Sequence, residues 1–243
     1  MIAEAKLESI AEGAIYHSIQ ILAQPNNAGK AAIKNQYTIE FAGTEIDIQI
    51  EDERNKIDIN SAQESLITAL LAYHLVGAQE AVTIGETMRN LRTLTTEKLF
   101  KNTAQFTNIS PLIASIYSCI QPYITVYSGQ SGIDYGSAPK KIKSLLDWAD
   151  TERWNNQLWA PNQPTNRASA VGNSSSVMRT SISHSGHAFT INATVSIEDD
   201  YQLTRSAIIR LTGNRLDPFW LMEIATKRRG NGQSIENSCK VKK

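Results

Sequence analysis

Three features are scarce in this 243-residue sequence: cysteine, long apolar runs and an excess of either charge. Its 24 basic residues balance 24 acidic ones. That balance argues against a protein whose main task is to grip a polyanion, because such binding depends on an excess of Lys and Arg. No window approaches the ~18–20 apolar residues that span a bilayer, and the N-terminus lacks a signal-peptide layout. We therefore expect a soluble chain.

Only two cysteines are present, and their surroundings differ. Cys119 lies in an apolar helical context, whereas Cys239 lies in a polar tail. This contrast favours one buried thiol and one incidental tail thiol over a disulfide.

The most informative stretch is Ile124–Leu146. It starts as a β-like run and passes through a Ser/Gly turn, in which Gly129 and Gly132 permit a positive φ. A helix is predicted to follow, with Ser137 as its cap and Pro139 in its first turn. Nothing in the stretch is a nucleophile with a base or a set of metal ligands, so its chemistry is that of folding.

Part of this stretch repeats an earlier one, which suggests a short internal repeat. The positions that recur are Ile57, Asp58, Ser61, Ala62 and Leu70, which reappear as Ile133, Asp134, Ser137, Ala138 and Leu146.

Residues 2–23 predict an amphipathic helix whose apolar stripe must be buried. The stripe can pack on this protein's own sheet or meet helices of other subunits, and both can hold along different lengths of the helix. The residues expected to make contacts between subunits are Leu7, Ile10, Ala14 and Ile21.

Strands and helices then follow in separate blocks. Alternation over 37–41 and 45–50 predicts a hairpin, with Ile46, Ile48 and Ile50 on one face. From Ser61 to about Trp159 the pattern is helical. It opens with a capping box of Ser61 and Glu64, and further helices are expected over 78–92, 95–106 and 110–120.

The last third of the chain returns to strands. Residues 160–186 are rich in Pro, Asn and Ser and predict a long surface loop. Strands are expected over 177–182, 187–197 and 202–211, with a short one over 220–224. Two basic clusters beyond it, 227–229 and 240–243, are expected to be solvated tail.

This order of elements predicts an α+β fold with three segments. Residues 1–60 would form the N-terminal helix and first strands, 61–160 an inserted all-helical domain, and 161–243 the loop, the remaining strands and the basic tail. The simplest construction is one antiparallel sheet packed on the N-terminal helix and interrupted by the helical insertion.

Two phrases carry a resemblance to a known family. Residues 51–62 contain DERNKIDINSA, and residues 122–139 contain ITVYSGQSGIDYGSAP. Both are similar to phrases of the minor pseudopilin K of bacterial type II secretion, the general secretion pathway protein K family. The resemblance implies a pilin-like fold, an N-terminal α-helix packed on an antiparallel β-sheet, with a large inserted helical domain.

The same resemblance implies a function. The chain would be the periplasmic part of a protein anchored in the inner membrane, through an N-terminal helix absent from this chain. It would be no enzyme but a tip subunit that joins minor pseudopilins I and J, with H as a further candidate, to initiate or cap the pseudopilus. An insertion of this size would clash with a subunit stacked above it, which favours the tip.

A helix-hairpin-helix DNA-binding protein of the periplasm is the alternative from another class. Such modules hold phosphates on the amides of a Gly-x-Gly turn, but only Gly77 stands there, beside His74, Gln79 and Glu80. Carboxylates near a phosphate site oppose binding, so no nucleic acid partner is expected.

Metal and catalytic motifs are weak. His184 and His187 could bind zinc or copper, but no further ligand lies near them in the sequence. A catalytic triad could combine Ser181 or Ser183 with His184 and with Asp199 or Asp200, but no turn typical of a nucleophile accompanies these residues. Calcium is the one cofactor left open, at two acidic clusters. These are Glu51, Asp52 and Glu53 with Asp58, and Asp147, Asp150 and Glu152. A solvated acidic face is favoured for both, and no cofactor is expected.

Overall fold

The structure is a computed structural model. It describes residues 2–24, 35–41, 43–74, 77–94, 99–133, 135, 138–156, 186–197, 201–230 and 239. The chain divides into two compact units, each described by itself. Unit 1 comprises residues 1–53 and 177–234, and unit 2 comprises residues 54–176 and 235–243.

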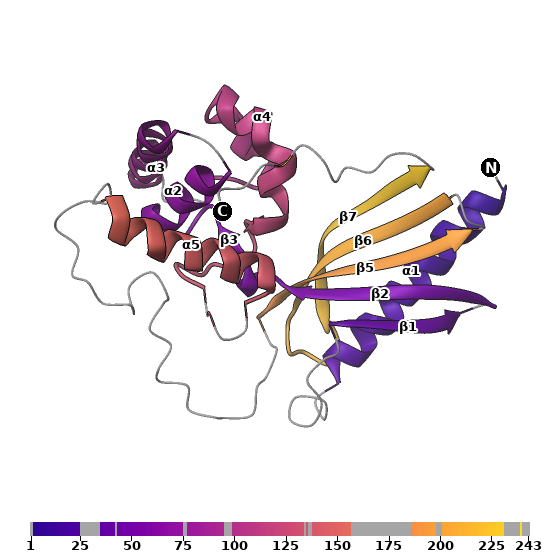
Figure 1. Cartoon of the computed structure of the whole chain (residues 1–243). Helices are drawn as coiled ribbons and strands as arrows, with labels where there is room; N and C mark the ends of the chain where they lie inside the picture. The colour runs from indigo at the N-terminus through magenta and orange to yellow at the C-terminus, as the bar shows by residue number, and fades with distance from the viewer. Residues whose placement is uncertain are drawn as a thin grey trace. The chain divides into compact units, whose positions relative to one another are not determined.

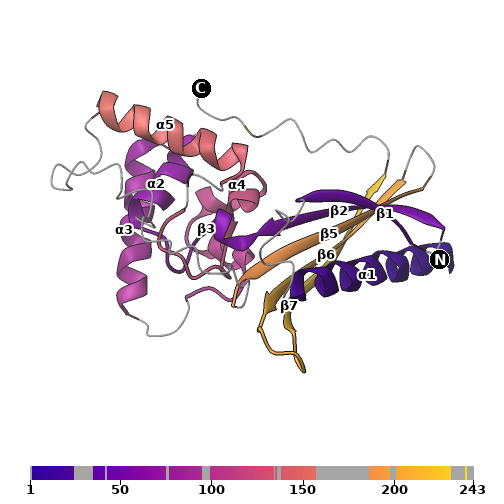
Figure 2. The ribbon, with the colours of Figure 1, turned by 90° about the horizontal axis from the view of Figure 1, so that it is seen from below.

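Unit 1 is built on an antiparallel five-stranded sheet with α1 across one face (Figures 1 and 2). The strand order is β1-β2-β5-β6-β7. The bounds are α1 Ile2–Ala23, β1 Gln36–Phe41, β2 Thr44–Asp52, β5 Ala188–Ile197, β6 Tyr201–Leu211 and β7 Phe219–Gly230.

The core of unit 1 lies between α1 and the sheet. The alternation predicted for β2 is confirmed, since Ile46, Ile48 and Ile50 are buried on one face. Gly43 supplies the positive φ of the β1–β2 turn, with a value of 73°. The one fully buried hydroxyl on α1, that of Ser18, is satisfied because it donates to the Ala14 carbonyl and accepts from Tyr37.

Unit 2 is inserted at a connection between neighbouring strands. Asp52 at the end of β2 pairs with Phe189 at the start of β5, yet the chain passes through residues 54–176 between them. A direct hairpin would have joined these strands with a few residues. The sheet of unit 1 therefore assembles from segments far apart in the sequence.

Unit 2 is mainly helical, with helices α2, α3, α4 and α5 gathered around a small parallel bridge (Figure 1). The helices are α2 Glu64–Tyr73, α3 Ala78–Thr93, α4 Pro111–Ile120 and α5 Lys140–Asn156. Ser110 caps α4 as predicted, since its hydroxyl accepts from the Leu112 amide. The bridge joins β3, Ile57–Asp58, to β4, Ile124–Thr125.

Asp58 links residues 51–62 to residues 122–139, the two stretches that resemble a known family. It is 1% exposed, and its carboxylate accepts hydrogen bonds from the Asn60 amide, the Ser128 hydroxyl and the Gly129 amide. Gly129 has the predicted positive φ, 67°. Arg92 closes the same loop by donating to the carbonyls of Ile59 and Ala62. The phrase 57–62 is thus a folding element of unit 2.

The suggested repeat agrees with burial at three of its pairs. Both members of each pair lie in the core of unit 2: Ile57 and Ile133, Ala62 and Ala138, Leu70 and Leu146. Asp134 and Ser137 lie outside the described residues, so the predicted cap of α5 does too. The helix begins at Lys140, directly after Pro139.

Several predictions about local structure are wrong. The helix expected over 95–106 is replaced, in the described part, by a loop over 99–102 and a 3-10 turn η3, Thr103–Asn108. Asn102 caps that turn by accepting from Gln105, a polar contact that the helical pattern concealed. The Ser61–Glu64 capping box is also absent. α2 begins at Glu64, so Gln63 is at the N-cap position and makes no side-chain cap, and Ser61 lies two residues further upstream, where its amide donates to the Asp58 carbonyl.

The last strand is longer than predicted. β7 has twelve residues and continues through Lys227, Arg228 and Arg229, which were expected to be solvated tail. Its whole length pairs with β6, from Phe219 opposite Leu211 to Gly230 opposite Tyr201. A long partner strand supplies backbone hydrogen bonds that outweigh the weak β-propensity of basic residues.

The architecture is α+β, as expected. The predicted strand over 177–182 and nearly all of the loop expected over 160–186 lie outside the described residues. At the C-terminal end, residues 235–243 belong to unit 2, although the predicted segments had grouped them with the sheet.

Candidate partner-binding surface

Helix α1 turns much of its predicted contact stripe into the core of unit 1. Ile10 and Ala14 are 6% and 0% exposed and pack against the sheet, while Leu7 and Ile21 are half-buried at the margin. Ile10 and Ala14 therefore have no surface left for another subunit, and the prediction is wrong for these two residues.

The reason is that the apolar arc of α1 is wider than one stripe. A second row of apolar residues lies on the neighbouring side of the helix and is equally buried: Ala11, Ile15, Ile19 and Leu22. A helix lying across a sheet buries such a broad arc, whereas two helices in contact share a narrower seam. The sequence contained this second row, and counting it would have centred the buried face correctly.

The outward face of α1 carries small and polar residues and one exposed aromatic ring. At about 100° per residue, the side opposite the core includes Ala5, Ser9, Tyr16 and Gln20, all exposed. His17 lies beside them. We call this set the outward face of α1. It is accessible along the helix, so it, and not the predicted stripe, is where a neighbouring helix could pack.

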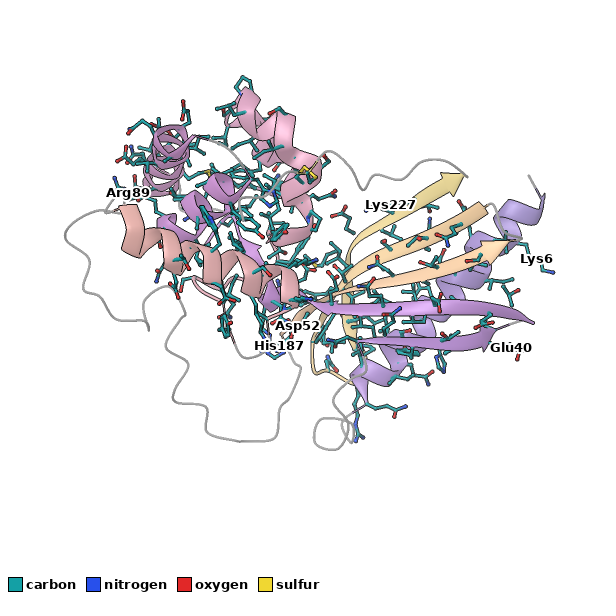
Figure 3. The ribbon with its side chains drawn as sticks, in the orientation of Figure 1. Lys6, Glu40, Asp52, Arg89, His187 and Lys227 are labelled. Carbon is teal, nitrogen blue, oxygen red and sulfur yellow. A yellow bond between two sulfur atoms is a disulfide. The ribbon has the colours of Figure 1, made fainter. Side chains whose placement is uncertain are left out.

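The connections to unit 2 arise at the end of the sheet where α1 finishes. β1 runs antiparallel to α1, since Tyr37 bonds to Ser18 while Phe41 lies against Gly13. β2 then runs parallel to α1 and ends at Asp52 beside the end of the helix. Figure 3 shows Lys6 and Glu40 toward one end of unit 1 and Asp52 and His187 toward the other.

A second accessible apolar region lies on β7. Large exposed apolar side chains cluster there: Trp220, Leu221, Met222 and Ile224. Phe219 at the start of the strand meets Tyr16 of α1 edge-on, with 6.2 Å between the ring centroids. The outward face of α1 and the apolar part of β7 are therefore continuous. The sequence predicted a strand over 220–224 but not its exposure, because which strand lies at the edge of a sheet depends on pairing with distant strands.

The helix pair α2–α3 does not offer an open phosphate site. Gly77 precedes α3, and the carboxylate of Glu80 occupies the space where a Cβ on Gly77 would lie. The free amides at this helix start thus face a negative charge, which repels phosphate. This arrangement opposes the DNA-binding alternative.

Most of the residues that the sequence suggested for catalysis or metal binding are not described by the structure. Ser181, Ser183, His184, Asp199 and Asp200 lie outside the described residues. His187 directly precedes β5, and its ring lies 6.4 Å from that of Phe189. Within the described ranges, no group of three or more His, Cys, Asp or Glu residues could hold a metal ion.

Three of the carboxylates considered for calcium accept hydrogen bonds from side chains or amides of the fold. In the first acidic set, Asp58 accepts the three hydrogen bonds of the 57–62 loop, and buried Glu53 accepts from the Thr190 hydroxyl. In the second, Asp147 accepts from the Tyr135 hydroxyl, which helps to raise the pKa of that phenol. These carboxylates serve the fold.

Cys119 and Cys239 form a disulfide, which corrects the expectation of two separate thiols. The sequence separation is 120 residues, so no local spacing could have indicated the pair. The bond ties the end of the chain to α4 of unit 2. Disulfides of this kind persist in oxidising compartments.

Unit 2 also buries a histidine among aromatic rings. His74 is 4% exposed, lies 4.9 Å from Tyr123 and 5.3 Å from Tyr73 between ring centroids, and neither ring nitrogen has a hydrogen-bond partner. Burial lowers the pKa of His74 to about 4, because the charged imidazolium would lose its hydration. The side chain is therefore a neutral core residue at pH 7.

No helix in the described part of the chain is long and apolar enough to cross a membrane. No protein-family model matches the sequence, and no curated protein is significantly similar to it.

Proposed function

We propose that this chain is a K-like minor pseudopilin of a bacterial type II protein secretion system, located at the tip of the pseudopilus. The observation that carries the proposal is the insertion of unit 2 between β2 and β5, neighbouring strands of a sheet backed by the N-terminal helix. We propose that this architecture is a pilin-like fold with a large inserted domain. The phrases over 51–62 and 122–139, which resemble the same family, support it.

The place of the insertion supports a tip position. The chain leaves unit 1 and returns at the end of the sheet where α1 finishes, away from the start of the helix. In a filament built on side-by-side N-terminal helices, a large insertion at that end obstructs any subunit stacked beyond it. The tip is the one position that has no such neighbour.

The disulfide supports the proposed compartment. A cross-link between Cys119 and Cys239 suits the periplasm, where thiols are oxidised, and not a reducing cytosol. The resemblance further implies an inner-membrane anchor ahead of α1. In this proposal the chain has no catalytic role and acts through assembly.

The proposed partners are the minor pseudopilins I and J, with H as a further candidate. Their N-terminal helices would pack on the outward face of α1, because the other side of the helix is buried against the sheet. The small residues Ala5 and Ser9 allow a neighbouring helix to approach closely.

Co-purification with soluble I-like and J-like subunits from the same secretion system tests the proposal. We expect a ternary complex with one copy of each chain. The double variant Ser9→Glu/Gln20→Glu should weaken it at least tenfold, or by about 1.4 kcal/mol, by placing charges in the helix contact. Gln36→Glu is a matched control, since Gln36 is an exposed glutamine on β1. The proposal fails if the unaltered chain forms no complex with either subunit.

A further inference from the structure

β7 exposes apolar side chains on a strand that belongs to a well-packed sheet. Trp220, Leu221, Met222 and Ile224 are between 39% and 56% exposed. On the adjacent strand β6, Ala207 and Ile209 are 1% and 0% exposed. The difference arises because α1 covers the middle of the sheet and reaches β7 only at its start, where Tyr16 meets Phe219.

Two of the exposed residues form a ledge beside α1. In the pairing with β6, Leu221 stands opposite Ile209 and Ile224 opposite Ala207, so they lie on the face that α1 covers elsewhere. A β-bulge at Met222 separates them. Arg205 bounds the ledge, since its guanidinium donates to Glu12 on α1 and to Thr226 on β7. The ledge is therefore apolar, with a polar limit toward the end of β7.

The backbone of β7 favours an extended segment over a helix as the binding partner. Among the described strands β7 is the last in the order of the sheet, so along its outer side alternate backbone N–H and C=O groups point away from β6. A helix could cover the apolar side chains but could not bond to these groups. An extended segment does both, by adding a sixth strand whose alternate side chains fall on the ledge.

The charge of β7 favours a different protein chain over a second copy of this one. The second half of β7 contains Lys227, Arg228 and Arg229, and the whole strand has a single carboxylate, that of Glu223. A second copy of this chain would set Lys227 opposite apolar residues of β7 if the strands were antiparallel, and opposite basic residues if they were parallel, so neither arrangement gives Lys227 a carboxylate partner. A partner segment with a carboxylate opposite Lys227 instead gains a cross-strand ion pair. The other edge strand, β1, has six residues and no basic residue.

We infer that β7 is a strand-addition site for an extended segment of a different protein chain, with apolar residues against Leu221 and Ile224 and a carboxylate opposite Lys227. This inference rests on the proposed function, because the partner that supplies the strand would be a neighbouring minor pseudopilin.

Hydrogen exchange and binding with the soluble I-like and J-like subunits test the inference. In the complex, the backbone amides within 219–230 that point away from β6 should exchange at least tenfold more slowly than in the free chain. Leu221→Lys/Ile224→Lys should weaken binding at least tenfold without changing the melting temperature, because both side chains are already exposed. Lys227→Glu should weaken binding and reduce its dependence on salt. Gln36→Lys, at an exposed residue of the opposite edge strand β1, is the matched control.

The outcomes separate this inference from the proposed function. A complex that forms with unchanged exchange over 219–230, and that tolerates both β7 variants, overturns strand addition and leaves the proposed function standing. Absence of any complex overturns the proposed function together with the inference that depends on it. Self-association of the chain through β7, detected as dimers that Leu221→Lys/Ile224→Lys dissolves, overturns the assignment to a different protein chain.

Discussion

Replacing His74 should remove a pH-dependent loss of stability from unit 2. The folded pKa of His74 is about 4, below its ordinary value of 6.5, so the unfolded chain binds the proton more tightly. The sign follows from linkage: stability is complete above about pH 6.5 and is lost as the pH falls toward about 4. The full shift is equivalent to roughly 3 kcal/mol, and about 2 kcal/mol of it is lost between about pH 7 and pH 5.

His74→Phe is the informative variant because the neighbours of His74 are aromatic. Tyr73 and Tyr123 meet the imidazole nearly edge-on, at interplanar angles of 86° and 74°, and a phenyl ring can keep both contacts. At about pH 7 the variant should be as stable as the unaltered chain or up to about 2 kcal/mol more stable, since it removes buried nitrogens that lack partners. At about pH 5 its advantage should grow by about 2 kcal/mol.

Urea unfolding at several pH values measures this difference. Tryptophan fluorescence reports mainly on unit 2, because Trp148, Trp154 and Trp159 belong to it and only Trp220 belongs to unit 1. His17→Gln is the control, since His17 is exposed on α1. The reasoning about His74 is refuted if the stability difference between His74→Phe and the unaltered chain is the same at both pH values.

Three further changes test the packing of unit 2 and its covalent link. Asp58→Ala should cost about 2–4 kcal/mol in urea unfolding, because it removes the buried acceptor of the Asn60 and Gly129 amides and of the Ser128 hydroxyl; an unchanged midpoint would contradict the role of this carboxylate. Gly85→Ala should lower the melting temperature, because the new Cβ would collide with the buried Thr68 hydroxyl, and that clash outweighs the roughly 1 kcal/mol that alanine gains in a helix. A higher melting temperature would show that the α2–α3 contact is looser than described. Cys119→Ser should cost about 2–5 kcal/mol and leave one thiol free for labelling. Two thiols reactive in the unreduced, unaltered chain would rule out the bond.

Periodicity predicted the elements whose burial is one-sided. The helix over 2–23 and the strands β2, β5 and β6 appear close to their expected bounds, because their apolar residues recur at the spacing that one buried face requires. The cap of α4 by Ser110 was equally readable, since a capping hydroxyl acts on amides within a few residues. Such interactions can be predicted because the residues that make them are close together in the sequence.

The errors fall where a distant partner decides the conformation. β7 continues through three basic residues because β6 lies beside it. Ser61 does not cap α2 because it lies in the turn that Asp58 forms with Gly129, two residues before the N-cap position Gln63. The contact stripe on α1 was misplaced because the sheet covers a broader arc of the helix than the pattern implied.

By itself, the sequence determined the class of fold, the alternation of sheet and helical blocks, and the inward faces of the strands. Those features follow from hydrophobic periodicity and local hydrogen bonding, which act over a few residues. Only the tertiary structure decided the Cys119–Cys239 bond, the burial of Ile10 and Ala14, and the exposed apolar strand β7. Each of these depends on which distant segment lies alongside, because the same side chain is core against a neighbouring element and surface without one.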